Sequence, residues 1–101
     1  MENPTGGAVK RFAGDGEKSQ DEYRRWKKWS RAWLATQRAK GMPAEAMGNL
    51  LYTLLDGTAQ RALDGVDNAE WEVDAGEEVI YDVLDGRFPE LEAQVIIPSH
   101  P

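Results

Sequence analysis

Apolar residues recur at helical spacing in three segments of the chain, with polar breaks between them. In residues 19–40 the large apolar positions are aromatic, in residues 43–57 they are mainly leucines, and in residues 74–88 they are Val, Ile, Leu and Phe. Side chains three or four residues apart share one face of an α-helix. The pattern therefore predicts an all-α fold, a small bundle of four to five short helices, with short connections and an extended N-terminal arm.

Capping and turn residues set the predicted limits of the first two helices. Ser19 followed by Glu22 has the spacing of a capping box, so the first helix should begin at Ser19. Gly41 should end it near residue 40, and Pro43 suits the start of the second helix, which we expect to continue to Gly57.

The later elements are marked in the same way. Thr58 is expected to cap a short helix that closes at Gly65, and a second box-like start at Asp74 opens a helix ending near Phe88. Gly48 lies inside the second helix, where it costs about 1 kcal/mol relative to Ala. A close crossing with another helix would explain that glycine.

The residues outside the helices divide the chain into three parts. Residues 1–18 are rich in glycine and predict an extended arm, anchored on the core by its isolated apolar residues Val9 and Phe12. Residues 19–89 form the helical lobe. Residues 90–101 are expected to be a tail or linker.

The stretch YRRWKKWSRAW, residues 23–33, combines aromatic and basic side chains. On a helical wheel its aromatic residues fall within an arc of about 140°, with the basic residues on the other side. Stacking on single-stranded nucleic acid needs both kinds on one exposed surface. The separation favours a core face, with Trp26 and Trp33 largely buried, and a basic face. The basic face is formed by Arg24, Lys27, Lys28 and Arg31, of which Arg24, Lys28 and Arg31 are expected to be exposed.

The remaining apolar positions on the inner faces define the candidate core. Its members, besides Trp26, are Trp33, Leu51, Leu54, Leu55, Val83, Leu84 and Phe88. At 101 residues the chain suits a single small domain, which can bury roughly two-thirds of its unfolded surface.

Charge is distributed unevenly along the chain, although the net charge is only −6. Residues 1–40 contain ten Lys/Arg and five Asp/Glu, a net charge of +5, whereas residues 41–101 have a net charge of −11. Such a chain could bind an anion at one end, stack head to tail on copies of itself, or neutralise its charges internally between neighbouring helices.

The side chains needed for common catalytic and metal sites are scarce. The chain has no cysteine and one histidine, His100 in the tail, so Cys/His and Ser/His/Asp arrangements lack members. No phosphate-binding glycine motif occurs, and the acidic residues 67–78 lack the ligand order of a calcium loop. We expect no enzymatic activity, metal or cofactor. No signal peptide or membrane span is evident, so we expect a cytoplasmic protein without membrane contact.

Four landmarks resemble the N-terminal lobe of the Gag capsid protein of gypsy-type LTR retrotransposons, or a domesticated Gag relative; a copia-type Gag is the alternative. A Phe-x-Gly element precedes the first helix, and that helix carries an aromatic residue and a Trp. The second helix, rich in leucine, ends in a Leu-x-Gly-x-Ala element, and a Trp-bearing connector then leads to a helix that ends in an aromatic residue. In this chain the landmarks are Phe12–Gly14, Tyr23 with Trp26, Leu55–Ala59, and Trp71 followed by Phe88.

The resemblance implies a structural protein that self-associates into hexamers and pentamers, the units of a virus-like shell around RNA. It implies no enzymatic activity, and RNA is contacted only indirectly by this lobe. In domesticated relatives the lobe can hold a short apolar peptide in a groove, with the preceding arm as a competitor. The matching groove and arm residues here are Val9, Phe12, Tyr23, Trp26 and Tyr52.

Three functional hypotheses follow. The first is an assembly module in which the basic face of one copy meets the acidic residues 64–78 of the next. The second is a peptide-binding adaptor that uses the groove. The third is a nucleic-acid-binding domain in which Arg24, Lys28 and Arg31 contact phosphates.

Overall fold

The computed structural model describes residues 9–89, and the predicted all-α fold is confirmed over that range. Residues 1–8 and 90–101, including the expected tail and His100, lie outside the described residues. The four α-helices are α2 (Ser19–Ala39), α3 (Met47–Tyr52), α4 (Gly57–Arg61) and α5 (Glu77–Arg87), and the two short 3-10 helices are η1 (Ala44–Ala46) and η2 (Asn68–Glu70).

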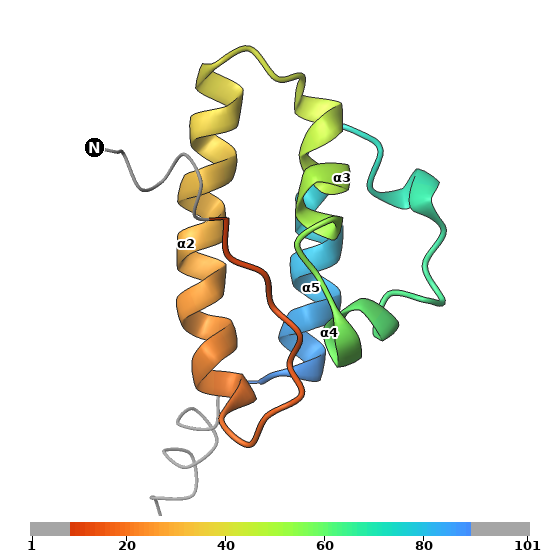
Figure 1. The fold of residues 1–101 in the computed structure, drawn as a ribbon. Helices are drawn as coiled ribbons and strands as arrows, with labels where there is room; N and C mark the ends of the chain where they lie inside the picture. The colour runs from red at the N-terminus through yellow and green to blue at the C-terminus, as the bar shows by residue number, and fades with distance from the viewer. Residues whose placement is uncertain (1–8, 90–101) are drawn as a thin grey trace, which may run out of the picture.

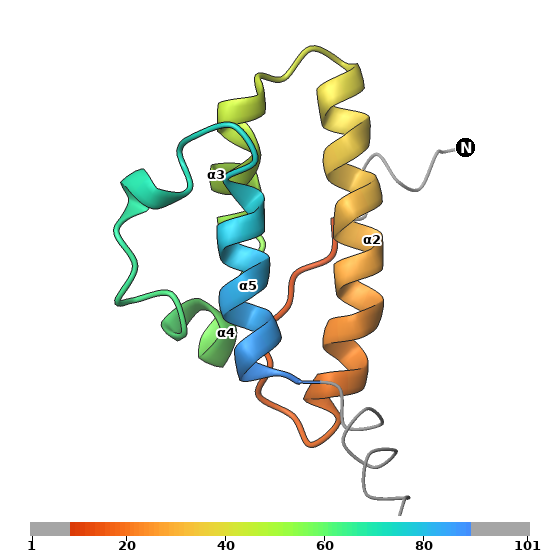
Figure 2. The ribbon, with the colours of Figure 1, turned by 180° about the vertical axis from the view of Figure 1, so that it is seen from behind.

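Helix α2 stands beside α3 and α5, which both run in the opposite direction to it (Figure 1). The arm, residues 9–18, descends between α2 and the segment formed by α3 and α4 before it turns into α2. Seen from behind, α5 lies next to α2, on the face of the molecule opposite the arm (Figure 2). The connector, residues 62–76, arches away on the side of the molecule opposite α2.

The C-terminal end of α2 follows the prediction, but its N-terminal cap differs. Gly41 has φ of 104°, and the N–H of Met42 reaches back to the carbonyl oxygen of Gln37, which closes the helix in the manner expected of a glycine beyond the last turn. The predicted capping box is wrong. Lys18 is the N-cap, and the Ser19 hydroxyl donates to the Gly16 carbonyl oxygen (2.5 Å).

Helix α3 is shorter than predicted at both ends. It begins at Met47, after η1, instead of at Pro43, and it ends at Tyr52 instead of continuing to Gly57. The backbone of Leu54 and Asp56 leaves the helix to hydrogen-bond with Phe12 of the arm. Backbone groups satisfied by the arm are not available for another helical turn.

The predicted caps of the two later helices are also wrong. Asp56, not Thr58, is the N-cap of α4, and its side chain makes no capping bond. Gly76 is the N-cap of α5 in place of the box at Asp74. The N-terminal end of α4 is instead satisfied by the distant Asp15, whose carboxylate accepts from the backbone N–H of Thr58 (3.0 Å).

The core confirms most of the predicted positions. Trp33 and Val83, which were expected inside, are only half-buried and pack against the edge of the core. The buried apolar residues are Phe12, Tyr23, Trp26, Leu34, Met47, Leu51, Leu54, Leu55, Ala59, Leu63, Trp71, Ile80, Tyr81, Leu84 and Phe88.

Gly48 allows the connector, not another helix, to approach α3 closely. A Cβ atom at this position would collide with the backbone carbonyl oxygen and the side chain of Trp71. The predicted close approach is therefore correct, but the crossing partner is a loop.

We expect Gly48→Ala to lower the free energy of unfolding by at least about 1 kcal/mol, because overpacking against a backbone atom outweighs the gain in helix propensity. Gly86→Ala in α5 is the matched control, since a Cβ there meets nothing within 4 Å. That variant should be stabilised by about 0.5–1 kcal/mol. Urea unfolding measures both, and equal stabilisation of the two variants would contradict the packing argument.

Candidate interaction surfaces

The arm is held in place by backbone hydrogen bonds to the segment between α3 and α4. The N–H of Phe12 donates to the carbonyl oxygen of Leu54 (2.9 Å), and the N–H of Asp56 donates to that of Phe12 (2.9 Å). The N–H of Ala59 donates to the carbonyl oxygen of Ala13 (2.8 Å). The arm thus pairs with the lobe as a short extended segment.

The side chain of Phe12 lies at the centre of an aromatic cluster. Its ring centroid is 5.5 Å from that of Tyr23, 5.4 Å from Trp26 and 5.1 Å from Phe88. The Trp26 indole also donates to the carbonyl oxygen of Lys10 (2.8 Å), which satisfies its N–H. With only 4% of its surface exposed, Phe12 is part of the core.

Two polar contacts flank Phe12 along the arm. The Arg11 guanidinium binds the Asp56 carboxylate through two hydrogen bonds of 2.7 Å, which lower the pKa of Asp56. Asp15 accepts from the Thr58 hydroxyl (2.5 Å) as well as from its N–H, and these bonds lower the pKa of Asp15. Both carboxylates are therefore ionised near neutral pH.

The predicted groove residues separate into two places. Phe12, Tyr23 and Trp26 meet at the docked arm, whereas the Tyr52 ring stacks on Trp71 at a centroid distance of 5.1 Å. Val9 is 43% exposed, so the arm is anchored by Phe12 and not by both residues. An open hollow of about 490 Å³ remains beside the arm, with Lys10, Arg25 and Trp26 among its lining residues.

Three of the four residues of the predicted basic face form ion pairs within the molecule, and two of these pairs join α2 to α5. Lys27 binds both carboxylate oxygens of Asp85 (3.0 and 3.1 Å), and Arg31 forms a two-point ion pair with Glu78 (2.8 and 3.1 Å). Arg31 also lies over the Tyr81 ring, 4.2 Å from its centroid. Internal neutralisation between helices, one of the three explanations of the uneven charge, is thus present between α2 and α5.

The other two basic residues differ in exposure. Lys28 is exposed as predicted, and Arg24, expected to be exposed, is half-buried and pairs with Asp21 (3.2 Å). Arg31 is exposed, although its charge is paired.

A hydrogen-bonded network continues from these ion pairs into the interior. The Tyr23 hydroxyl donates to Asp85 (2.6 Å), and the hydroxyls of Ser30 and Tyr81 share a hydrogen bond of 2.6 Å. Burial raises the pKa of Tyr23, with the Asp85 carboxylate adding to the effect, and burial raises the pKa of Tyr81 to about 12. Both phenols are therefore neutral at physiological pH and act as hydrogen-bonding groups between helices.

The pKa values of Asp85 and Glu78 predict a loss of stability in acid. Burial alone would raise the pKa of Asp85, but the hydrogen bonds from Tyr23 and Lys27 outweigh it and lower the pKa. The ion pair with Arg31 likewise lowers the pKa of Glu78. A carboxylate with a lowered pKa contributes its full stabilisation above the unfolded-state pKa of about 4, and loses it as the pH falls through the folded-state value.

We therefore expect the free energy of unfolding to fall as the pH drops below about 5, and Asp85→Asn to make this decrease shallower. The amide oxygen can still accept from Tyr23, so the variant should remain folded at pH 7. Urea unfolding at a series of pH values measures the slope. Asp82→Asn, at an exposed position on the same helix, is the control. An unchanged slope in Asp85→Asn would contradict a contribution of Asp85 to the loss of stability in acid.

The aromatic residues of α2 pack against the core to different extents. Tyr23 and Trp26 are buried, whereas Trp29 and Trp33 are half-buried, and their rings stack on each other at a centroid distance of 5.9 Å.

Within residues 9–89, no three Asp, Glu, His or Cys side chains lie close enough together to hold a metal ion. No helix in that range is long and apolar enough to cross a membrane.

Lys27 and Arg31 were predicted from the sequence as members of the basic face, and Glu78 lies in the predicted acidic region. Arg11 and the carboxylates of Asp15, Asp56 and Asp85 were not predicted to take part in such contacts. Asp15, Asp56, Glu78 and Asp85 are spread over the chain without a motif. The only available signal was the opposite net charge of the two halves of the chain, which does not specify pairs.

Comparisons of the chain with models of known protein families, with curated proteins and with solved structures found no match.

Proposed function

We propose that this chain is a non-enzymatic assembly module, similar to the N-terminal lobe of a Gag capsid protein, whose copies associate side by side into a shell around RNA. The observation that carries the proposal is the convergence of the landmarks on which the resemblance rests. Phe12 packs on Tyr23, Trp26 and Phe88, and its backbone pairs with the Leu55–Ala59 region.

The glycine of the first landmark fits the same explanation. Gly14 has φ of 72°, and a Cβ there would collide with the Phe88 ring. The Phe-x-Gly element therefore supplies one ring to the cluster and leaves space for another. Elements far apart in the sequence have a shared structural purpose, which supports treating them as one pattern.

Sedimentation velocity over a series of protein and salt concentrations tests the proposal. We expect concentration-dependent association that weakens as salt rises, because charged surfaces contribute to the contacts. Electron microscopy of the associated fraction should show regular rings or shells. A protein that stays monomeric at every protein and salt concentration would contradict the proposal.

A peptide-binding adaptor is the second candidate, and the docked arm is the observation that favours it. Residues 10–13 bind as an external peptide would, through backbone pairing and one buried side chain. The test is an NMR titration of apolar peptides into the full chain and into a variant lacking residues 1–14. Shifts confined to Tyr23, Trp26 and Leu54 in the shortened variant would favour the adaptor, and their absence would exclude it.

A further inference from the structure

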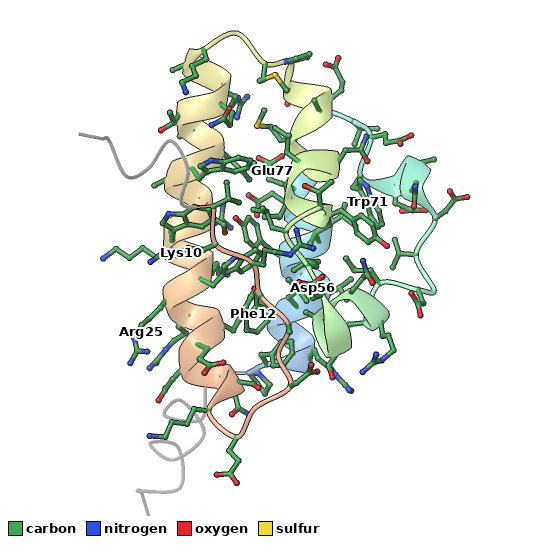
Figure 3. All side chains as sticks on the ribbon, in the orientation of Figure 1. Lys10, Phe12, Arg25, Asp56, Trp71 and Glu77 are labelled. Carbon is green, nitrogen blue, oxygen red and sulfur yellow. The ribbon has the colours of Figure 1, made fainter. Side chains whose placement is uncertain are left out.

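Two unpaired, oppositely charged surfaces remain once the internal ion pairs are accounted for. The basic strip consists of Lys10, Arg25 and Lys28, all exposed. The Trp26–Lys10 hydrogen bond holds Lys10 beside α2, and Arg25 and Lys28, three residues apart, share its outer side. Figure 3 shows Lys10 and Arg25 projecting away from the rest of the molecule. Within the described range none of the three forms an ion pair with a neighbour.

The acidic face lies on the connector between α4 and α5. Residues 64–74 contain five carboxylates and no Lys or Arg, and all five side chains are exposed. Val73, 47% exposed, adds an apolar side chain between two of them. The members of the acidic face are Asp64, Asp67, Glu70, Glu72 and Asp74.

The two surfaces lie on opposite sides of the lobe, with α3 and α5 between them (Figures 1 and 2). They cannot pair within one molecule, and a two-fold dimer cannot pair both at once. We propose that the basic strip of one copy docks on the acidic face of a second copy, in a head-to-tail contact that repeats from copy to copy. This contact rests on the proposed assembly function and gives that assembly a specific interface and direction.

The proposed contact differs from a general attraction between the basic helix and the acidic half. Lys27 and Arg31 take no part in it, because they already form ion pairs with Asp85 and Glu78 of the same molecule. Glu78 is excluded from the acidic face for the same reason. Because the residues of both surfaces are exposed, the expected contact is weak for each pair, fast to form and sensitive to salt. A head-to-tail contact forms a ring where its rotation closes and a filament where it does not.

Charge reversal with complementation tests the contact. The basic-strip variant is Arg25→Glu/Lys28→Glu, and the acidic-face variant is Glu70→Lys/Asp74→Lys. Neither of these two carboxylates accepts a hydrogen bond from the described residues. Each variant alone should sediment as a monomer at concentrations where the unmodified chain associates. An equimolar mixture should associate again, because the reversed strip of one complements the reversed face of the other. Glu45→Lys/Asp82→Lys makes the same charge change as the acidic-face variant, at exposed positions outside both surfaces. This control should associate normally.

Zero-length carbodiimide cross-linking of a mixture of ¹⁴N- and ¹⁵N-labelled chains locates the contact directly. We expect links between chains that join Lys10 or Lys28 to the acidic face, whereas the Lys27–Asp85 pair should link within a chain. Normal association of either reversed variant, or a mixture that stays monomeric, overturns this interface and leaves the assembly proposal intact. If the unmodified chain never associates and forms no such links, both proposals fall. Loss of RNA binding in the basic-strip variant, with association unchanged, would assign the strip to phosphates and also overturn the contact.

Discussion

Phe12→Ala is expected to lower the free energy of unfolding by about 3–5 kcal/mol, the usual cost of removing a buried phenylalanine ring. The ring fills the space between Tyr23, Trp26 and Phe88, and no other arm residue can replace it. A domain of this size typically has only about 5–15 kcal/mol of stability. The loss should therefore appear as a large shift in the midpoint of urea unfolding.

The same variant should also release the arm. Trypsin cleavage after Lys10 and Arg11 should become much faster, because the backbone pairing of Phe12 no longer has the ring to hold it. Val9→Ala is the matched control on the same arm. Since Val9 is exposed, its unfolding free energy should change by no more than about 0.5 kcal/mol. Equal effects of the two substitutions would show that the arm does not belong to the core.

Trp71→Ala is expected to have a comparable effect, also about 3–5 kcal/mol. The side chain is 1% exposed, its ring stacks on Tyr52, and its indole N–H donates to Asn49 (2.9 Å). Its backbone also fills the space left by Gly48 and Gly76. Removing the ring leaves a cavity under the connector and frees the connector from α3.

Urea unfolding again measures the effect, and Val73→Ala, an exposed position on the same connector, is the control. The loss of unfolding free energy in Trp71→Phe should lie between those of Trp71→Ala and Val73→Ala. The phenylalanine keeps an aromatic ring for Tyr52 but loses the hydrogen bond to Asn49. If Trp71→Ala were as mild as Val73→Ala, the connector would have to be held by other contacts.

The helical periodicity was sufficient to predict the fold class and most of the core. Leucines at helical spacing predicted burial of Leu51 and Leu54, and the wheel predicted that of Trp26. It overestimated the burial of Trp33, which is half-buried at the edge of the core and stacks on Trp29. Periodicity reports which face is apolar but not how far the neighbouring element extends.

The candidate surfaces were less predictable, because they depend on contacts between distant segments. The apolar run through Leu54 and Leu55 is compatible with both a helix and an extended chain. Pairing with Phe12 of the arm favours the extended conformation. Lys27, Lys28 and Arg31 share one side of the helical wheel. Their division into paired residues (Lys27, Arg31) and an unpaired one (Lys28) depends on where α5 places Asp85 and Glu78.

The position of Phe12 also has a consequence for how the chain folds during synthesis. The arm leaves the ribosome before its partners Leu54 and Phe88, which come much later in the sequence. Contacts between such distant residues form slowly, because a long loop must close before they can contribute. The arm should therefore wait undocked until α5 has emerged, so a nascent chain halted before Phe88 should expose Tyr23 and Trp26 to chaperones.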